Sequence, residues 1–435
     1  MRNKARINLK KFIVKIFTKV DHMLAILIAS IVLIMNYRKI ARSEVVVYIH
    51  DGGYGHTITE IDIARRIFND KNLTVILPSE LGRHNWKQAQ IWPGINVIHV
   101  IKSMRYHAFT QTLNMEKYVL SMLRILFGFK KYELESDKSK LDIGREVILT
   151  RELQELLIRD VKGRCSEICQ DPSTPAVDIY MAYWFKSIEL YEAMTPTLPK
   201  KQLSYFYKRM ESVLRGRGKF VTIYMRLKGF GSDGELRCGS GFEAYSKSID
   251  YLIESGYTIL LVGDRSLNNC PIYDRHKYYN AERLHLNQDW FNLFAATECK
   301  LFIGDPGGGM VLPSITKVPR LIINGYPYVQ VMHGYLILFK RLLDADGQDL
   351  PMKTCFKQLT YHLNPTIGSL IRNNTEMEIF EAVKELMAVD PDNWLDYIKG
   401  NTDRQGRAIT IENGSPLGRL GLGPCRLADC QLQLI

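Results

Sequence analysis

Two glycine-rich turns, about 250 residues apart, constrain the fold of this chain more than any other feature. In each, an apolar strand pattern runs into glycines and a helical pattern follows. The strand patterns are 45–49, before the turn at 50–56, and 301–303, before the turn at 304–309. Glycine lets backbone N–H groups approach a ligand, and the start of a helix attracts anions. Two such units predict two α/β domains that face each other across a cleft.

The same alternation of strand and helix patterns continues through much of the chain. Its rhythm predicts parallel sheets with helices on both faces. The stretch 105–215 is mostly helical in pattern, and the sequence does not predict where its individual elements begin and end. We expect a basic and apolar segment at 1–42 and two α/β domains at 45–212 and 218–365. C-terminal helices that pack back are expected at 366–404 and a disordered tail at 405–435.

The N-terminal segment concentrates the charge of the chain. Residues 1–42 hold ten Lys and Arg residues against one acid, Asp21, so they carry +9 of the net charge of +12. These charges flank the apolar run 23–35, which indicates attraction to a membrane surface and not to nucleic acid. A helix over that run rises only about 20 Å, short of the ~30 Å hydrocarbon core.

We therefore predict that the segment associates with a membrane as an interfacial or re-entrant helix or as a marginal span. A buried core helix and a signal peptide are the alternatives. Because the α/β pattern begins only at Val45, removal of residues 1–42 is expected to leave a folded, soluble protein.

Neither a disulfide framework nor a metal site is indicated. The eight cysteines are scattered without a Cys-x-x-Cys pair, which is typical of reduced cytosolic thiols. Asp344 and Asp346 form an Asp-x-Asp pattern, but in a loop after the sheet, where acidic pairs are common by chance. We predict no bound metal.

The candidate ligand-binding residues lie where predicted strands end, because ligands of open parallel sheets bind beyond the carboxyl ends of the strands. Arg226 at such an end suits a phosphate clamp, with a surface ion pair as the alternative. The turn at 307–309 suits a diphosphate, with a ligand-free tight turn as the alternative. Neither glycine turn matches a dinucleotide or ATP loop. The residues at these ends include Asp51, Gly53, Gly55, His56, Arg226, Gly263, Asp264, Gly307, Gly308 and Gly309.

The stretch 219–330 resembles the donor-binding half of GT-B-fold glycosyltransferases, and more narrowly a bacterial family of polysaccharide and cell-surface glycosyltransferases. The Gly55-His56 pair is similar to a Gly-His turn in the acceptor half of such enzymes. Where the family has His, Asp and Asn, this chain has Tyr224, Leu227 and Cys238. The residues that carry the resemblance are Tyr224, Met225, Arg226, Arg237, Cys238, Tyr245, Ser248 to Leu252, Gly256, Tyr257, Gly263 and Asp264.

The resemblance implies two Rossmann-like domains and transfer of a sugar from a nucleotide-sugar donor to a glycan or lipid-linked acceptor. The nucleotide sugar is a co-substrate, and no cofactor is implied. Domain 218–365 would bind the donor and domain 45–212 the acceptor. With the basic N-terminal segment, this places the active domains on the cytoplasmic side of a bacterial inner membrane. The residues expected to bind the donor are Arg226, Arg237, Gly263, Asp264, Gly307, Gly308 and Gly309.

The reaction needs a base for the acceptor hydroxyl and positive groups for the departing diphosphate. His56 is the first candidate for the base and Asp51 the second. Glu60 ranks last, because it also fits a helix-capping box that begins at Thr57. Gly53, Gly55 and Glu60 are expected to bind the acceptor.

The sequence leaves two other functions open. A sugar-nucleotide epimerase shares the two-domain fold, although a membrane-seeking segment favours a transferase. A non-catalytic sugar-binding component of polysaccharide assembly is kept open by Tyr224 and Leu227, the departures from the family pattern.

Overall fold

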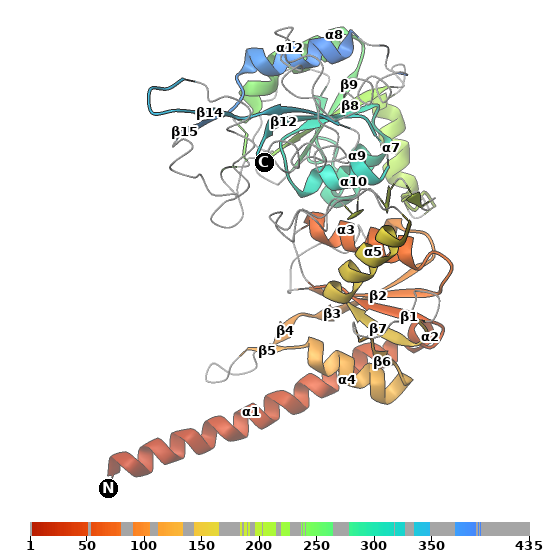
Figure 1. The fold of residues 1–435 in the computed structure, drawn as a ribbon, viewed down its shortest axis with the longest axis vertical. Coiled ribbons are helices and arrows are strands. Elements are labelled where there is room, and N and C mark those ends of the chain that lie inside the picture. Colours follow the sequence, from red (N-terminus) through yellow and green to blue (C-terminus); the bar gives the residue numbers. More distant parts are fainter. Residues whose placement is uncertain are drawn as a thin grey trace. The chain divides into compact units, whose positions relative to one another are not determined.

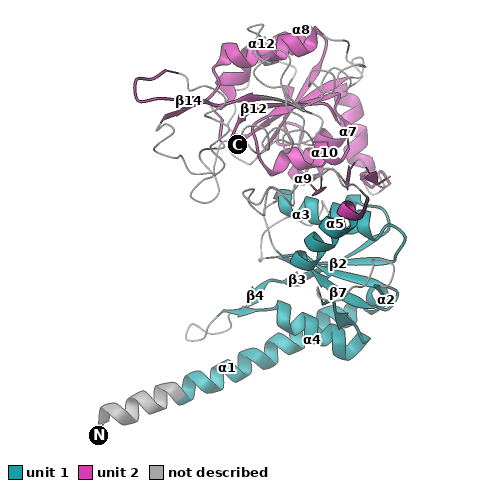
Figure 2. Ribbon diagram, in the orientation of Figure 1, with its two compact units in different colours: residues 1–160 teal, residues 161–435 magenta. Residues whose placement is uncertain are grey.

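The computed structural model divides into two compact units, residues 1–160 and residues 161–435 (Figure 2). Each unit has its own parallel sheet. The structure describes the chain except residues 1, 51–53, 80–89, 105–111, 134–142, 165–182, 185–186, 189, 192–195, 202, 215–218, 227–235, 237, 240, 264–277, 317, 327–334, 349–369, 389, 391 and 393–435.

Unit 1 contains a five-stranded parallel sheet in the order β3-β2-β1-β7-β6 (Figure 1). The chain moves from β1 to β2 and β3 on one side and returns to β7 on the other, so the strand order reverses between β1 and β7. All residues of β1 are apolar and buried, as is typical of an inner strand of a parallel sheet with both faces covered. The strands are β1 (Val45–Tyr48), β2 (Leu73–Ser79), β3 (Ile95–Ile101), β6 (Lys130–Lys131) and β7 (Glu146–Leu149).

The helices of unit 1 include α3, which connects β1 to β2, and α4, which packs against α1. A two-stranded antiparallel pair, β4 with β5, precedes α4. Their bounds are α1 (Arg2–Met35), α2 (Tyr37–Ala41), α3 (Tyr54–Ile67), β4 (Ser103–Met104), β5 (Leu113–Asn114), α4 (Glu116–Phe127) and α5 (Thr150–Arg164).

The second half of α1 belongs to the core of unit 1. Ala25, Ala29 and Leu33 are buried in one hydrophobic cluster with side chains of α4 and of the sheet. Their spacing of four residues places them on one face of the helix. Residues 1–42 are therefore not separable from unit 1, and the expectation that they could be removed without harm to the fold is corrected.

The helix α1 is also longer than the 13-residue run suggested, because it continues through Asp21 and His22. Asp21 lies on the same buried face as Ala25, and the His22 ring contacts the hydroxyl group of Tyr118 on α4. Both polar residues thus face protein and do not interrupt the helix. The stretch Phe12–Met35 has 24 residues and a mean hydropathy of 1.9, so by length and composition it could cross a membrane.

Unit 2 contains a six-stranded parallel sheet in the order β10-β9-β8-β11-β12-β13. This is the strand order of a doubly wound Rossmann sheet, with its reversal between β8 and β11. The strands are β8 (Phe220–Met225), β9 (Thr258–Gly263), β10 (Tyr278–Tyr279), β11 (Leu301–Gly304), β12 (Arg320–Gly325) and β13 (Tyr335–Phe339).

Short connecting elements and a two-stranded antiparallel pair, β14 with β15, complete the described part of unit 2. The last helix, α12, packs on α8 of the same unit, and Phe380 meets Tyr251 edge to face. The elements are α7 (Ser204–Leu214), the 3-10 helix η4 (Phe242–Tyr245), α8 (Ser246–Glu254), α9 (Gln288–Glu298), the 3-10 helix η6 (Gly308–Met310), α10 (Val311–Ile315), β14 (Arg341–Leu343), β15 (Leu370–Arg372) and α12 (Glu376–Met387).

The predicted fold class, an α/β chain with two Rossmann-like units, is confirmed by these two parallel sheets. The chain passes from unit 1 to unit 2 within α5, after residue 160, whereas the sequence pattern suggested a boundary near 212. The predicted tail at 405–435 lies outside the described residues.

Candidate functional site

The site in unit 2 is built around Asp305, which directly follows β11 and is fully buried. Its carboxylate accepts hydrogen bonds from the backbone N–H of Arg226 (2.9 Å), the hydroxyl of Tyr245 (3.0 Å) and the side-chain amide of Asn324 (2.8 Å). These donors come from the ends of β8 and β12 and from η4. Burial raises the pKa of Asp305 to about 6, while the three hydrogen bonds lower it. One carboxylate thus holds three carboxyl-edge segments in place.

Arg226 lies beneath the glycine turn. Its Nη1 donates to the carbonyl of Pro306 at 3.3 Å, and the residue is buried. A Cβ added to Gly307 would lie 3.2 Å from this Nη1 and 3.2 Å from the hydroxyl oxygen of Tyr224. The predicted pairing of Arg226 with the turn at 307–309 is therefore present in the structure. Asp305 binds the backbone N–H of Arg226.

Two glycines of this turn are required by packing. A Cβ on Gly304 would collide with the backbone carbonyl of Tyr224, and one on Gly309 would lie 2.6 Å from the Tyr224 ring. The turn therefore rests directly on Tyr224, at a position where the resembling family has His. Gly307, Gly308 and Gly309 are partly exposed, so their backbone is accessible to a ligand.

A second cation, Lys340, was not identified from the sequence. It follows β13, is buried, and donates to the carbonyl of Cys238 at 2.7 Å. Burial lowers the pKa of Lys340 to about 8, while the negative charge of Asp305 raises it. A lysine that closes a strand at the carboxyl edge is the signal that could have found it.

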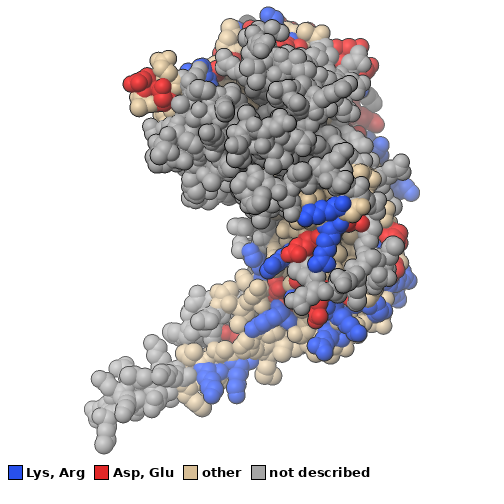
Figure 3. Space-filling model, in the orientation of Figure 1, with Lys and Arg blue, Asp and Glu red and all other residues tan. Residues whose placement is uncertain are grey.

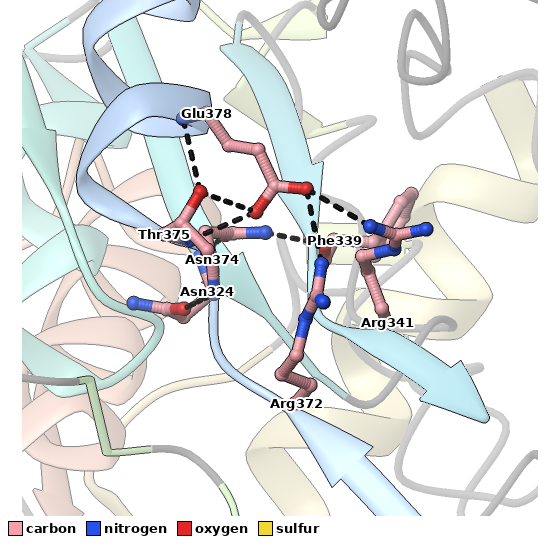
Figure 4. Close-up of polar contacts among 7 residues, drawn as sticks. All are labelled: Asn324, Phe339, Arg341, Arg372, Asn374, Thr375 and Glu378. Carbon is pink, nitrogen blue, oxygen red and sulfur yellow. Dashed lines mark hydrogen bonds and ion pairs between the residues drawn. The ribbon is translucent and has the colours of Figure 1, made fainter. Parts of the chain in front are cut away.

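The site is connected to α12 by a buried pair of asparagines (Figure 4). The backbone N–H of Asn324 donates to the side chain of Asn374, and the backbone N–H of Asn374 donates to that of Asn324, both at 2.7 Å. Asn374 also donates to the carbonyl of Phe339 at 2.8 Å. Thr375 and Glu378 then form a capping box at the start of α12.

Of the other predicted donor residues, the structure describes only Gly263. Gly263 ends β9, and its carbonyl accepts a hydrogen bond from Asn292 at 3.3 Å. Arg237 and Asp264 lie outside the described residues.

The site in unit 1 lies at the carboxyl ends of β1 and β7. The hydroxyl of Thr150, directly after β7, accepts the backbone N–H of His50 at 2.9 Å and donates to Glu60 at 3.2 Å. Burial raises the pKa of Glu60 to about 8, although the hydrogen bond from Thr150 lowers it. The helix α3 begins at Tyr54, so Thr57 lies inside it and the predicted capping box does not form. Glu60, on α3, instead accepts a hydrogen bond from Thr150, the residue that joins the ends of β1 and β7.

The two sequence-predicted bases differ in their placement. His56 is exposed in the first turn of α3, next to Gly55. Asp51 and Gly53 lie outside the described residues. A histidine to which the sequence assigned no role, His50, directly follows Ile49 at the end of β1, and its Nδ1 is 3.3 Å from Glu116 Oε2.

The Asp344 and Asp346 pattern forms a surface turn. One oxygen of Asp344 accepts the backbone N–H groups of Asp346 (2.9 Å) and Gln348 (2.8 Å). Among the described residues, no group of three or more His, Cys, Asp and Glu side chains could hold a metal ion.

Comparison with protein-family models finds no match, and comparison with curated proteins finds none. Solved structures do match. One is the ADP-heptose LPS heptosyltransferase II of E. coli, at 11% identity over 81% of this chain and 99% of that one, with a TM-score of 0.44. Another is a family 9 glycosyl transferase of Veillonella parvula, at 12% identity over 79% and 97%, with a TM-score of 0.45.

A third match is the UDP-GlcNAc 2-epimerase of Neisseria meningitidis, at 9% identity over 90% of this chain and 98% of that one, with a TM-score of 0.38. Similarity at this level does not extend to individual residues or to an activity. The functional assignment of this chain therefore rests on its own residues.

Proposed function

We propose that this protein is a glycosyltransferase that moves a sugar from a nucleotide-sugar donor to a glycan or lipid-linked acceptor at a membrane surface, without a bound metal. The observation that carries the proposal is the placement of the Arg226 guanidinium against the accessible backbone of the turn at 307–309. This pairing lies at the reversal of strand order in the sheet of unit 2, where ligands of such sheets bind.

The donor site supplies what a departing diphosphate needs. Arg226 is a permanent cation whose planar guanidinium matches phosphate oxygens. Because it is buried and fixed by the Pro306 carbonyl, its charge is oriented before the reaction begins. Gly307 to Gly309 add backbone N–H groups. Lys340 adds a positive charge that interacts with Asp305. Arg237, Gly263 and Asp264 stay proposed donor residues from the sequence resemblance.

The acceptor site is proposed at the carboxyl edge of the sheet in unit 1. A side chain there removes the proton of the acceptor hydroxyl, and Asp51 and His56 are the candidates from the sequence. Glu60 is less suited to this role, because a carboxyl group with a pKa of about 8 holds its proton at neutral pH. Gly53, Gly55 and Glu60 remain the proposed acceptor-binding residues.

The membrane is contacted through α1. One face of this helix is buried in unit 1, while large apolar side chains cover much of the rest. Figure 3 shows this largely uncharged surface bordered by Lys and Arg side chains. Because α4 and the sheet pack on the second half of α1, a span through that half would draw unit 1 into the bilayer. We therefore favour a helix that lies on the cytoplasmic face, held by apolar and basic contacts. The exposed apolar residues are Phe12, Ile13, Ile16, Val20, Met23, Ile26, Leu27, Ile31, Ile34 and Met35.

The test starts from donor binding. Thermal unfolding of the purified protein is followed with ADP-, UDP-, GDP-, CMP- and dTDP-linked sugars, because a ligand that binds only the folded state raises the unfolding temperature. Transfer of radiolabel from the stabilising donor to washed bacterial membranes is then measured. A shift with one donor class and incorporation of label are expected.

Two other results would reject the proposal. Isomerisation of the donor sugar without any acceptor would identify an epimerase. Binding of a sugar nucleotide with neither transfer nor isomerisation would identify a non-catalytic sugar-binding protein.

A further inference from the structure

We infer that His50, oriented by Glu116, is the base that deprotonates the acceptor hydroxyl. The inference rests on the proposed function and deepens it, because it assigns the catalytic group of unit 1 to a pair of residues that lie 66 positions apart in the sequence.

The backbone at His50 is fixed at the point where a ligand of this sheet would bind. His50 directly follows the last buried residue after β1, and its N–H donates to Thr150 Oγ1 at 2.9 Å. Thr150 follows β7, so the bond joins the two strands between which the strand order reverses. The reversal point of an open parallel sheet is where its ligand-binding crevice forms.

The imidazole is oriented but remains accessible. Its Nδ1 lies 3.3 Å from Glu116 Oε2, and the ring of Tyr48 meets it nearly edge to face, with centroids 6.2 Å apart. The side chain of His50 is 55% exposed, whereas that of Glu116 is only 19% exposed. Within the described part of the chain, Nε2 has no partner, so it is open to an acceptor. A base that is oriented by a third group is the arrangement that activates an oxygen nucleophile in many enzymes.

The reaction step balances with these groups. His50 Nε2 takes the proton of the acceptor hydroxyl while that oxygen bonds to the anomeric carbon of the donor. The bond from this carbon to the diphosphate oxygen breaks, and its electron pair leaves with the nucleoside diphosphate. Glu116 stabilises the imidazolium, which then returns the proton to water. Direct displacement of this kind inverts the configuration at the anomeric carbon.

A structural role for the pair predicts a different outcome upon mutation. Exposed ion pairs contribute little to stability, so loss of this one should barely change the unfolding temperature. Loss of a general base, by contrast, reduces turnover by about 10²- to 10⁴-fold. The two roles therefore separate in a single variant, His50→Gln.

The experiment uses the full-length protein with radiolabelled ADP-, UDP-, GDP- and dTDP-linked sugars and washed bacterial membranes as the acceptor source. Label incorporation, donor-induced thermal shift and the unfolding temperature are measured for wild type, His50→Gln, Glu116→Gln, Glu116→Asp and His56→Gln. The control is Glu155→Gln, which removes an exposed ion pair with Arg151 on α5, at 3.6 Å.

We expect His50→Gln to lose transfer by about 10²-fold or more with an unchanged donor shift. Glu116→Gln should lose transfer and change its pH profile, because the orienting charge is gone, and Glu116→Asp should recover part of both. Glu155→Gln should match wild type.

Near wild-type transfer by His50→Gln overturns the inference and leaves the proposed function intact. If only His56→Gln loses transfer, the base is His56. Loss of the fold or of the donor shift in His50→Gln assigns it a structural role and also overturns the inference. A wild-type protein that shows neither donor shift nor transfer overturns the proposed function, and the inference with it.

Discussion

At the scale of single residues, buried carboxyl groups organise both carboxyl edges. Asp305 binds donors from three segments in unit 2, and Glu60 accepts the Thr150 hydroxyl that joins β1 to β7 in unit 1. Neither carboxyl group is explained by its own sequence neighbourhood. Their partners lie between 19 and 90 positions away.

Replacement of Arg226 by Ala should weaken donor binding far more than it weakens the fold. A charge-assisted phosphate contact contributes about 1.5–3 kcal/mol, or a ten- to hundredfold change in affinity. Titration of the nucleotide sugar by calorimetry measures the loss. The matched control is Arg283→Ala, because Arg283 also donates Nη1 to a carbonyl, that of Tyr278, at 3.0 Å. A similar loss of affinity in both variants would contradict a phosphate-binding role.

Replacement of Glu60 by Gln should flatten the dependence of stability on pH. The pKa of Glu60 is raised to about 8 in the folded protein, above its value in the unfolded chain. Between those two values the folded state binds more protons, so stability falls as pH rises, by at most about 1.4 kcal/mol per pH unit. Glu60→Gln removes this contribution. Denaturant unfolding at pH 5 to 8 tests the prediction, and identical slopes for both proteins would refute it.

At the scale of elements, α1 has two faces that differ in burial. Asp21, Ala25, Ala29 and Leu33 lie buried on one face, while the exposed side chains from Val20 to Met35 are apolar. The buried face shows that the second half of the helix is part of the core of unit 1.

A triple replacement of Leu27, Ile31 and Ile34 by Gln should release the protein from membranes without unfolding it. These side chains are about half exposed, so their loss removes apolar contact with lipid and little core packing. We expect at least about a tenfold weaker association with phosphatidylethanolamine–phosphatidylglycerol vesicles, which corresponds to about 1.4 kcal/mol. Flotation of the vesicles measures it.

The control for this prediction is Leu33→Ala on the buried face. It should lower the free energy of unfolding by about 2–5 kcal/mol and leave vesicle binding per folded molecule unchanged. Wild-type protein that remains unbound at low salt would show that α1 does not contact lipid.

At the scale of the whole molecule, each unit contributes one carboxyl edge with its own chemistry. Unit 2 presents cations and glycine backbone, and unit 1 presents histidines and a buried carboxyl group. Neither set alone supplies both a leaving-group site and a base. The proposed reaction therefore requires both units.

Transfer activity should survive chelation by EDTA. In the proposed function Arg226 and backbone N–H groups stabilise the leaving diphosphate. The acidic pattern at Asp344 uses a carboxylate oxygen to fix its own turn. Label incorporation with and without EDTA checks this. Loss of activity that Mg²⁺ or Mn²⁺ restores would instead point to Asp344 and Asp346, and Asp346→Asn would then abolish it.

The sequence determined the local units of this protein. The strand–glycine–helix turns, the alternation that gives two parallel sheets and the capping box at Thr375 are all set within a few residues, because backbone freedom, capping and apolar periodicity act over one or two turns of chain. For the same reason, Arg226 and the turn at 307–309 could be named as one site once the strands were recognised as parallel.

Tertiary structure decided what depends on distant partners. The strand β7 has only four residues and no glycine turn, and it is defined by its place between β1 and β6. The pairs His50–Glu116 and Lys340–Cys238 join segments 66 and 102 positions apart, and Ala25 is buried in a cluster that includes side chains of α4. Such contacts form only when the chain has already packed, because no local preference of either residue encodes its partner.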